Sequence, residues 1–250
     1  MSLIIDHVKQ EVRAFLTALA FFTRLPIPIR RFCLPESAFY LPLLGYFLGA
    51  FLAFAGWFWS SVLNPWLLAL FILALQYYLA NFFHFDGLLD MVDALAAFGG
   101  VEKRLAVLKT PEVGALGLLF GFFFLLGEFL MMKEVVAQGL WGVILLRPAA
   151  GRLLLSLVAL WGRPAKKEGL GVIFLKHTKR RFILAQIFWI PILVLTPWAG
   201  LITMCLVIPL VLKFQRNFGG LTGDLLGASV EIGEWVFLAV VVLGLKGASW

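Results

Sequence analysis

The chain has 250 residues, of which 62% are hydrophobic and only 14% charged, and its mean hydropathy of +0.98 excludes an ordinary soluble globular domain. The formal net charge of +7 is compatible with nucleic acid, but the basic residues stand in short segments between long apolar runs, as lipid head groups and membrane topology demand. We therefore predict no nucleic-acid partner. Because no polar stretch is long enough for a soluble domain, residues 1–250 are predicted to form one all-α bundle of membrane helices.

The first segment, residues 8–23, makes a helix too short to cross a bilayer comfortably, so an interfacial or re-entrant helix is expected there. About seven apolar runs follow, and each is predicted to span the membrane; for the short fifth and sixth runs the alternative is a tilted or broken helix. Gly45 and Gly49 stand four residues apart in the first run, a spacing that permits close packing of helices in lipid. The runs cover residues 38–60, 67–85, 114–132, 141–161, 182–197, 200–212 and 235–245.

Lysine and arginine are distributed unevenly among the connections between these runs. The connections on one side hold 15 of the 21 basic residues, whereas those on the other side hold Lys133 alone. Cytoplasmic loops carry an excess of lysine and arginine, so we expect these segments, and the motifs beside them, to lie on the cytoplasmic side of the membrane. The membrane is expected to be a prokaryotic inner membrane. The basic segments are residues 24–31, 103–109, 163–181 and 213–216.

Three aspartates follow the second apolar run, in the stretch NFFHFDGLLDMVDALAAFGG at residues 81–100. On a helix, Asp86, Asp90 and Asp93 project within roughly 60° of one another, and such close negative charges repel. A cation between them would remove the repulsion, and carboxylate oxygens suit Mg²⁺ or Mn²⁺. The alternative, a solvated helix end with scattered acids, is disfavoured because charge next to lipid is costly and usually functional. His84 is a candidate base, metal ligand or hydrogen-bonded spacer.

A glycine-rich segment, RNFGGLTGDLLGASVEIGE at residues 216–234, precedes the last run. Its glycines allow backbone amides to approach an anion closely, and Asp224 is suited to hold the counter-cation. The alternative is a flexible membrane turn with packing glycines. Glu231 and Glu234 are either metal ligands or acids at a helix end. The residues predicted to contact substrate here are Gly219, Gly220, Thr222 and Gly223.

Arg147 and Arg152 interrupt the fourth run, where an arginine at mid-membrane costs roughly 2.5 to 3.5 kcal/mol. Each is expected to face a polar cavity, an acid or a phosphate, and a guanidinium fits phosphate well. The alternative is an internal ion pair, for example with Glu128. The basic loop that follows, residues 163–181, binds either an anionic substrate or anionic lipid, and lipid is favoured for residues 179–181 beside a span.

Five segments of the chain match, in order, the segments of a known family. They read FFTRLPIP from residue 21, LPLLGYFLGA from residue 41, FHFDGLLDMVDA from residue 83, KEGLGVIF from residue 167 and GGLTGDLLGASVEIGE from residue 219. The sequence thus resembles the cobalamin synthase family, the adenosylcobinamide-GDP ribazoletransferases, over nearly its whole length. The patterns HxDGxxDxxD and GGxTGDxLGAxxExGE are specific, and they occur together.

The resemblance implies a membrane enzyme that requires Mg²⁺, with Mn²⁺ as a substitute, and joins adenosylcobinamide-GDP to α-ribazole or its 5′-phosphate. It implies that a ribazole hydroxyl attacks the phosphorus attached to the corrinoid while GMP leaves. The expected metal ligands are Asp86, Asp90, Asp93, Asp224 and Glu231. The catalytic candidates are His84, Lys109 and Arg152, the last as a phosphate clamp. Further expected substrate contacts are Arg24, Lys167, Glu168 and Gly169.

One segment departs from the family pattern, and two other functions compete with the resemblance. Where the family reads K-D-S-R-x-G, residues 109–114 read KTPEVG, so the roles of an acid and an arginine are unfilled or moved. A CDP-alcohol phosphotransferase uses a similarly acidic helix, but it opens with DGxxAR, whereas this chain reads DGLLD from Asp86. A transporter would place its buried charges near the middle of the membrane, at corresponding positions in two halves of the chain. The polar groups are instead expected to cluster at one membrane face, which disfavours a transporter. Membrane lipid and a second copy of the chain are further partners that the sequence allows.

Overall fold

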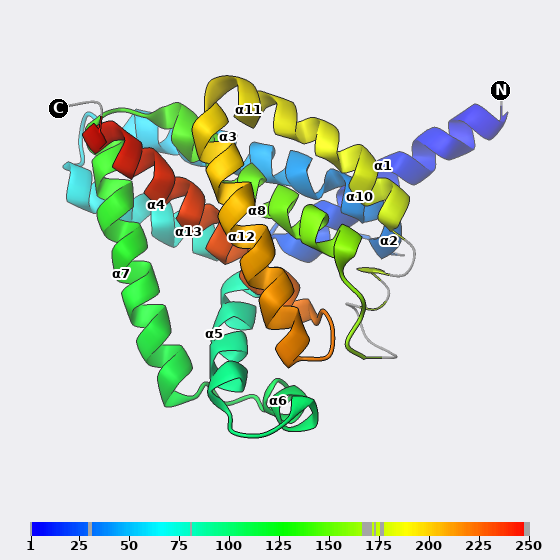
Figure 1. Ribbon diagram of the computed structural model, residues 1–250. Helices are drawn as coiled ribbons and strands as arrows, with labels where there is room; N and C mark the ends of the chain where they lie inside the picture. Colours follow the sequence, from blue (N-terminus) through cyan, green and yellow to red (C-terminus); the bar gives the residue numbers. More distant parts are fainter. Residues whose placement is uncertain are drawn as a thin grey trace.

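Long apolar segments fold as helices here because a helix satisfies its backbone N–H and C=O groups internally, which lipid cannot do. The computed structural model describes residues 2–29, 32–80, 82–166, 172, 174, 175 and 178–247, and every named element in those residues is a helix, as the sequence predicts. Figure 1 shows α7 and α12 running steeply while α4 and α13 cross them obliquely. The elements are α1 (Ser2–Phe22), α2 (Leu34–Ser37), the 3₁₀ helix η1 (Ala38–Tyr40), α3 (Leu41–Trp59), α4 (Pro65–Leu79), α5 (Phe83–Ala96), α6 (Val101–Val107), α7 (Ala115–Ala137), α8 (Trp141–Trp161), α10 (Lys179–Ala185), the 3₁₀ helix η2 (Gln186–Trp189), α11 (Ile190–Leu195), α12 (Pro197–Asn217) and α13 (Gly223–Gly247).

Within the described residues, five helical segments are long and apolar enough to cross a membrane, and α4 with α5 makes a sixth if this bent pair is one span. The five are Leu34–Trp59, which joins α2, η1 and α3, together with α7, α8, α12 and the part of α13 from Gly223 to Leu245. The multi-pass helical fold expected from the sequence is thereby confirmed, with a number of spans close to the predicted seven. The N-terminal helix α1 is not one of these candidates. It begins at Ser2 and has 21 residues, so the predicted start at residue 8 is wrong, and its interfacial or re-entrant placement stays a prediction.

Two of the predicted runs have different bounds in the structure. Residues 182–197 are divided among α10, η2 and α11, and the division precedes Pro191, whose ring is incompatible with a continuous helix. The last helix begins at Gly223, well before the predicted start at Trp235, so most of the glycine-rich segment is helical. Its glycines do not break the helix because other helices pack closely there: a side chain at Gly233 would overlap Leu154 of α8.

The central helix of the fold is α8, whose residues are almost all buried from Val143 to Ala159. A helix covered on all sides has no polar face, which explains why α8 is apolar apart from Arg147, Arg152 and Ser156. The glycine pair of α3 lies against it: an added Cβ at Gly45 would stand 2.6 Å from the Pro148 carbonyl oxygen, and one at Gly49 would overlap the Leu145 carbonyl. The close packing predicted at Gly45 and Gly49 is confirmed.

A sharp break separates α4 from α5 and corrects the predicted second run, which assumed one continuous segment to residue 85. The Asn64 side chain accepts hydrogen bonds from two backbone amides at the start of α4. At the other end, Phe82 adopts a left-handed conformation with φ of 56°, and the two helices diverge by 90°. The bend turns Asp86 and its neighbours out of the line of α4 and towards α13.

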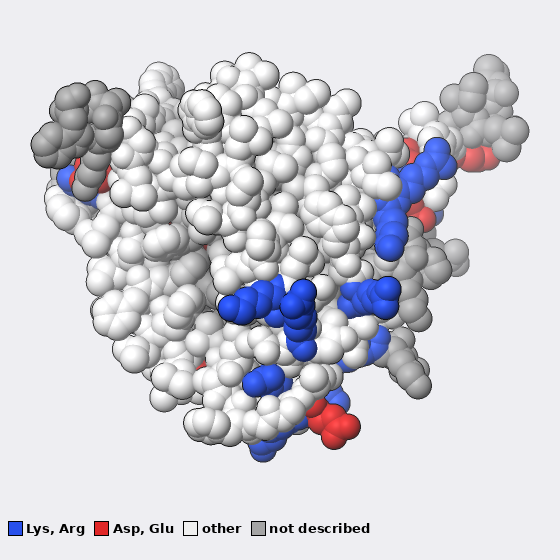
Figure 2. Space-filling view, in the orientation of Figure 1, with Lys and Arg blue, Asp and Glu red and all other residues white. Residues whose placement is uncertain are grey.

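The basic segments gather at one end of the fold. Arg104 of α6 donates a hydrogen bond of 3.3 Å to the Asn217 carbonyl at the end of α12, and Pro164 pairs with Leu221 in an isolated β-bridge. Figure 2 shows lysine and arginine side chains grouped over the lower and right-hand parts of one face, below a broad uncharged surface. Basic segments that are distant in the sequence therefore lie together, as the predicted one-sided topology requires.

The contact between α3 and α8 predicts the effect of adding a single methyl group. Gly49→Ala is expected to lower the free energy of unfolding by about 1–3 kcal/mol, because the new methyl group overlaps backbone of α8. Gly142→Ala is the matched control, since an added Cβ at Gly142 meets nothing within 4 Å. Thermal unfolding of the purified protein in detergent measures both variants, and equal melting temperatures would contradict the packing described here.

Candidate active site

A cavity of about 530 Å³ lies between the end of α1, the start of α5 and the start of α13. This volume is within the range of small-molecule sites in proteins. Its lining residues include a polar group and an aromatic group, which we call the polar wall and the aromatic wall. The polar wall includes His84, Asp86, Lys166, Thr222 and Asp224. The aromatic wall includes Phe21, Phe22, Phe82, Phe83 and Phe174.

The two acidic motifs meet at this cavity because α5 and α13 cross at glycines. An added Cβ at Gly87 would stand 2.8 Å from the Asp224 carbonyl oxygen and 2.9 Å from the Asp224 Cα. On the other helix, an added Cβ at Gly227 would stand 3.3 Å from the His84 Cα. The close crossing brings Asp86 and Asp224, 138 positions apart in the sequence, to one cavity, as the sequence-based hypothesis of a shared site requires.

The aspartates form a region of negative charge rather than a closed cage. The charges of Asp86, Asp224 and Asp93 all act on Asp90. Among the residues that the structure describes, no three histidine, cysteine, aspartate or glutamate side chains converge closely enough to hold a metal ion on their own. A cation here would need ligands from water or substrate in addition to the protein carboxylates.

Asp93 has a structural contact that the sequence did not indicate. Its two carboxylate oxygens accept hydrogen bonds of 2.8 Å from the backbone amides of Gly114 and Gly117. Gly114 is the N-cap residue of α7, so Asp93 supplies from α5 the capping oxygen that glycine lacks. Its negative charge is also favourable at the positive end of the helix dipole. Asp93 therefore joins α5 to α7, which fixes the acidic helix in place.

His84 lies where the two walls of the cavity join. It is only 5% exposed, and its ring stacks on Phe22 with centroids 6.0 Å apart. Its Nδ1 atom is buried and has no hydrogen-bond partner among the described residues. The His84 side chain lines the cavity, whereas its Nδ1 lies at the helix crossing, 3.6 Å from the position of an added Cβ at Gly227.

The start of α13 faces the same cavity and provides a site of positive potential. Thr222 lies just before the helix, and its hydroxyl accepts a 3.1 Å hydrogen bond from the Leu225 amide. Gly223 lines the cavity, and nothing lies within 4 Å of the position that a Cβ would take there. The N-terminal amides of a helix attract anions, and the nearby charge of Lys166 acts in the same sense.

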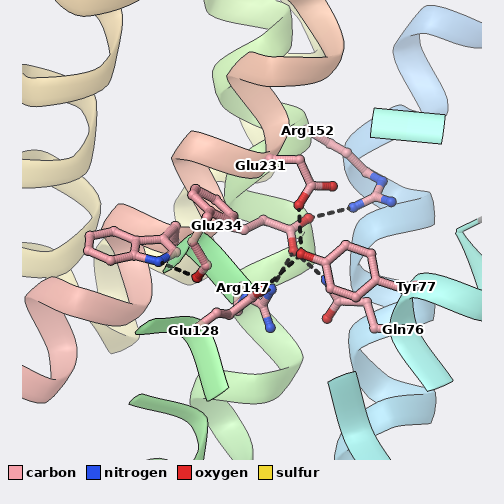
Figure 3. Close-up of polar contacts among 9 residues, drawn as sticks. Gln76, Tyr77, Glu128, Arg147, Arg152, Glu231 and Glu234 are labelled. Atoms are coloured by element: carbon pink, nitrogen blue, oxygen red, sulfur yellow. Dashed lines mark hydrogen bonds and ion pairs between the residues drawn. The ribbon is translucent and has the colours of Figure 1, made fainter. Parts of the chain in front are cut away.

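Two arginines are buried deeper in the bundle, where they pair with acids (Figure 3). Arg147 forms ion pairs with Glu128 and, at 3.3 Å, with Glu234. Arg152 forms an ion pair of 3.0 Å with Glu234 and donates a hydrogen bond of 2.8 Å to the Pro148 carbonyl. The internal ion pair between Arg147 and Glu128, one of the two alternatives left open by the sequence, is thus present.

Side chains of α4 complete this cluster. Gln76 donates a 2.7 Å hydrogen bond to Glu234, and the Tyr77 hydroxyl lies 2.8 Å from a Glu128 oxygen and 3.1 Å from a Glu231 oxygen. We call these residues the buried ion cluster. Gln76 and Tyr77 were not among the site residues predicted from the sequence, although two polar side chains in an apolar run were the available signal. The buried ion cluster consists of Gln76, Tyr77, Glu128, Arg147, Arg152, Glu231 and Glu234.

The structure separates the other predicted site residues into groups. Arg152 and Glu231 belong to the buried ion cluster and are not among the described residues that line the cavity. Gly219 and Gly220, with φ of 69° and 156°, shape the turn between α12 and α13. The Arg24 guanidinium lies 4.8 Å from the Tyr78 ring centroid and 5.9 Å from that of Phe82, beside the cavity, whereas Lys109 is exposed next to Leu108 of its lining. The predicted contacts Lys167, Glu168 and Gly169 lie outside the described residues.

An ion pair anchors α1, which carries Phe21 and Phe22 of the aromatic wall. Arg181 of α10 donates two hydrogen bonds of 2.7 and 2.8 Å to the Glu11 carboxylate, and the Tyr40 hydroxyl donates a third of 2.8 Å. The hydrogen bonds from Arg181 lower the pKa of Glu11 below its usual range. The anchor therefore holds the aromatic wall against the rest of the cavity.

Comparison with known proteins identifies the relatives of this chain. Residues 14–242 match the family model described as cobalamin-5-phosphate synthase. Relatives named adenosylcobinamide-GDP ribazoletransferase occur in Thermosipho melanesiensis (29% identical, 92% of this chain and 98% of the relative), Thermodesulfovibrio yellowstonii (30%, 94% and 98%) and Deinococcus radiodurans (34%, 96% and 87%). No solved structure matches the chain. The family resemblance read from the sequence motifs is confirmed.

The buried ion cluster predicts a large loss of stability when one charge is removed. Arg147→Met leaves Glu128 buried without its counter-ion and is expected to cost roughly 3–5 kcal/mol. Adding Glu128→Gln, which removes the opposite charge, is expected to restore part of that loss. Thermal unfolding in detergent compares the variants, and a single variant as stable as the unmodified protein would contradict the assigned pairing.

The anchor of α1 predicts a dependence on pH. Because the pKa of Glu11 is lowered in the folded protein, its stabilising contribution is complete above the ordinary glutamate pKa of about 4.3 and is lost as the pH falls below it. Amide hydrogen exchange in α1, corrected for intrinsic rates, is expected to quicken between pH 5 and pH 3. Glu11→Gln should exchange faster than the unmodified protein at pH 5 and should show no comparable change between pH 5 and pH 3. An equal pH response in the two proteins would exclude Glu11 as its origin.

Proposed function

Because the chain belongs to the cobalamin-5-phosphate synthase family, it is a transferase, and we propose that it joins adenosylcobinamide-GDP to α-ribazole or its 5′-phosphate. In this reaction a ribazole hydroxyl attacks the phosphorus next to the corrinoid, and the bond from that phosphorus to the GMP oxygen breaks. The hydroxyl proton passes to a base on the protein. The products are adenosylcobalamin, or its 5′-phosphate, and GMP.

One observation carries the proposal: the crossing of α5 and α13 puts Asp86, Asp224 and Lys166 on a single cavity. Transfer between phosphate esters needs little covalent chemistry from a protein, and it depends on positioning and on charge stabilisation. Acids and a lysine around a cavity of this size supply both for a diphosphate. Further support comes from the basic segments that meet at this end of the fold, which we propose to be the cytoplasmic side.

The start of α13 and Lys166 are proposed to bind the diphosphate of adenosylcobinamide-GDP. The helix N-terminus offers backbone amides and positive potential, and the open space beside Gly223 lets phosphate oxygens approach them. Lys166 adds a full positive charge at the same wall. Together they orient the phosphorus for attack from the other side of the cavity.

His84 is proposed to receive the proton of the attacking hydroxyl. Its side chain lines the cavity two residues before Asp86, and its ring stacks on Phe22, which keeps water away from that face. A neutral imidazole has one unprotonated ring nitrogen, which can accept a proton. Asp86 and Asp224 are proposed to bind a cation and not to receive this proton.

The carboxylates of the cavity fit a Mg²⁺ ion shared with the substrate. Mg²⁺ usually keeps several waters and binds through one or two carboxylates plus substrate phosphates, so an incomplete protein cage is the expected arrangement. We propose Asp86 and Asp224 as its ligands, with Asp90 close enough to contribute charge. When bound, the ion would neutralise the diphosphate and the charge that develops on the departing GMP.

Membrane vesicles containing the protein are expected to form cobalamin or cobalamin phosphate from adenosylcobinamide-GDP and a ribazole donor only with Mg²⁺ or Mn²⁺. Asp86→Asn, Asp90→Asn and Asp224→Asn are each expected to lower kcat about 100-fold, because each removes charge that holds the cation and phosphates. Product formation is measured by separating the corrinoids chromatographically. Equal yield in excess EDTA would count decisively against the proposal.

Asp93→Asn is the control for a structural aspartate on the same helix. Its expected effect is a lower melting temperature, equivalent to about 1 kcal/mol, because Asp93 caps α7. The dependence of its activity on Mg²⁺ concentration should stay close to that of the unmodified protein. A shift in the Mg²⁺ requirement of this variant would instead make Asp93 a metal ligand, as the sequence first indicated.

A further inference from the structure

The cavity has two unlike walls, and we infer that its phenylalanine wall binds the flat, apolar base of α-ribazole. This inference rests on the proposed function, because it assigns one of the two proposed substrates to one part of the same cavity. It leaves the diphosphate to the polar wall. The phenylalanine wall is the part of the aromatic wall whose rings contact one another, namely Phe21, Phe22, Phe83 and Phe174; the Phe82 ring stacks on Tyr77 instead.

Phe83 presents the accessible ring of this wall. It is 42% exposed, and the rings of Phe21 and Phe22 lie edge to face with it at centroid distances of 5.3 and 5.7 Å. Phe174, which is buried, contacts Phe22 in the same way at 6.0 Å. The surrounding rings hold Phe83 in place, so its exposed surface is available for stacking on a planar ligand at a small entropic cost.

The chemistry of this wall distinguishes between the two aromatic bases in the reaction. Guanine carries amide and amino groups, and these groups need hydrogen-bond partners when they are buried. The four side chains of the phenylalanine wall contain no such partner. The base of α-ribazole is a dimethylbenzimidazole, with two methyl groups and a single ring nitrogen outside the glycosidic bond. An aromatic, apolar wall therefore fits α-ribazole better than it fits GMP.

The position of His84 favours the same assignment. Its ring stacks on Phe22 and lies edge to face with Phe83 of the phenylalanine wall, and it lines the same cavity as Asp86. In the proposed reaction only the acceptor loses a proton, whereas GMP leaves as an anion. A base that is next to the phenylalanine wall can therefore serve the sugar of a nucleoside bound there, and that nucleoside has to be the acceptor.

The size of the cavity limits what else can enter it. A volume of about 530 Å³ suits a ligand of nucleoside size, and a complete corrinoid is much larger. The corrinoid must therefore stay outside while its phosphates reach the polar wall at Lys166 and Asp224. This arrangement leaves the phenylalanine wall to the smaller substrate.

The test measures α-ribazole binding to the purified protein in detergent, with the benzimidazole fluorescence as the signal. Phe83→Leu keeps the apolar bulk and loses the aromatic face, and it is expected to raise the Kd of α-ribazole about three- to tenfold. Phe83→Tyr keeps the face and should stay within about twofold of the unmodified protein. Phe51→Leu, on the exposed side of α3, is the matched control and should change nothing.

The kinetic readout is a separation of the two KM values in vesicles. Phe83→Leu is expected to raise the KM for α-ribazole about three- to tenfold and to leave that for adenosylcobinamide-GDP within about twofold. Unchanged binding and kinetics, a rise in the KM for adenosylcobinamide-GDP, or displacement of α-ribazole by guanosine would each overturn the assignment.

These outcomes separate the inference from the proposed function. A protein that binds α-ribazole through Phe83 but forms no corrinoid product would support the phenylalanine wall and refute the proposed reaction. A protein that forms product without any dependence on Phe83 would support the reaction and refute the wall. Absence of α-ribazole binding to the unmodified protein would refute the inference directly.

Discussion

An arginine cannot remain unpaired in an apolar bundle, and the pairing of Arg147 and Arg152 constrains how the neighbouring helices sit. Both arginines contact Glu234, which fixes the rotation of α13 about its axis and its position along that axis. Gly227 lies seven residues earlier, on the same side of the helix after about two turns, and it packs against the start of α5. Asp224 is thereby brought to the cavity. A charge cluster deep in the bundle thus determines the geometry of a site nearer its end.

The bend between α4 and α5 is the second requirement of the site. A straight continuation of α4 would carry the acids away from α13, and the left-handed Phe82 prevents this. Such a conformation costs about 1–3 kcal/mol in a bulky residue, so contacts elsewhere must maintain it. The hydrogen bonds that Asp93 accepts at the start of α7, and the packing of Gly87 on Asp224, hold α5 in its bent direction. The strained backbone of Phe82 and the repulsion among the aspartates of α5 therefore occur together at this site. The packing of α5 against α7 and α13 offsets the free-energy cost of both.

The sequence predicted those features whose cause is local or compositional. Apolar runs indicated helices, the four-residue spacing of Gly45 and Gly49 indicated a close contact, and the cost of buried charge indicated partners for Arg147. The capping of α7 by Asp93 is a long-range contact between residues that carry no local signal for each other. The aromatic wall was missed for a different reason. Phenylalanine makes up 25 of the 250 residues and occurs in most of the apolar runs, so Phe83 does not stand out without its neighbours in space.

The balance of charge in the cavity links its two proposed ligands to each other. Asp86 and Asp224 line it, Asp90 lies nearby, and the lysine among its described lining residues is Lys166. A diphosphate entering alone would meet more negative than positive charge, and a divalent cation entering alone would find too few protein ligands. Each ligand supplies what the other lacks, so each must strengthen the binding of the other by the same factor. The apolar acceptor carries no comparable charge when unphosphorylated, and its binding on the aromatic wall should therefore be nearly independent of the cation.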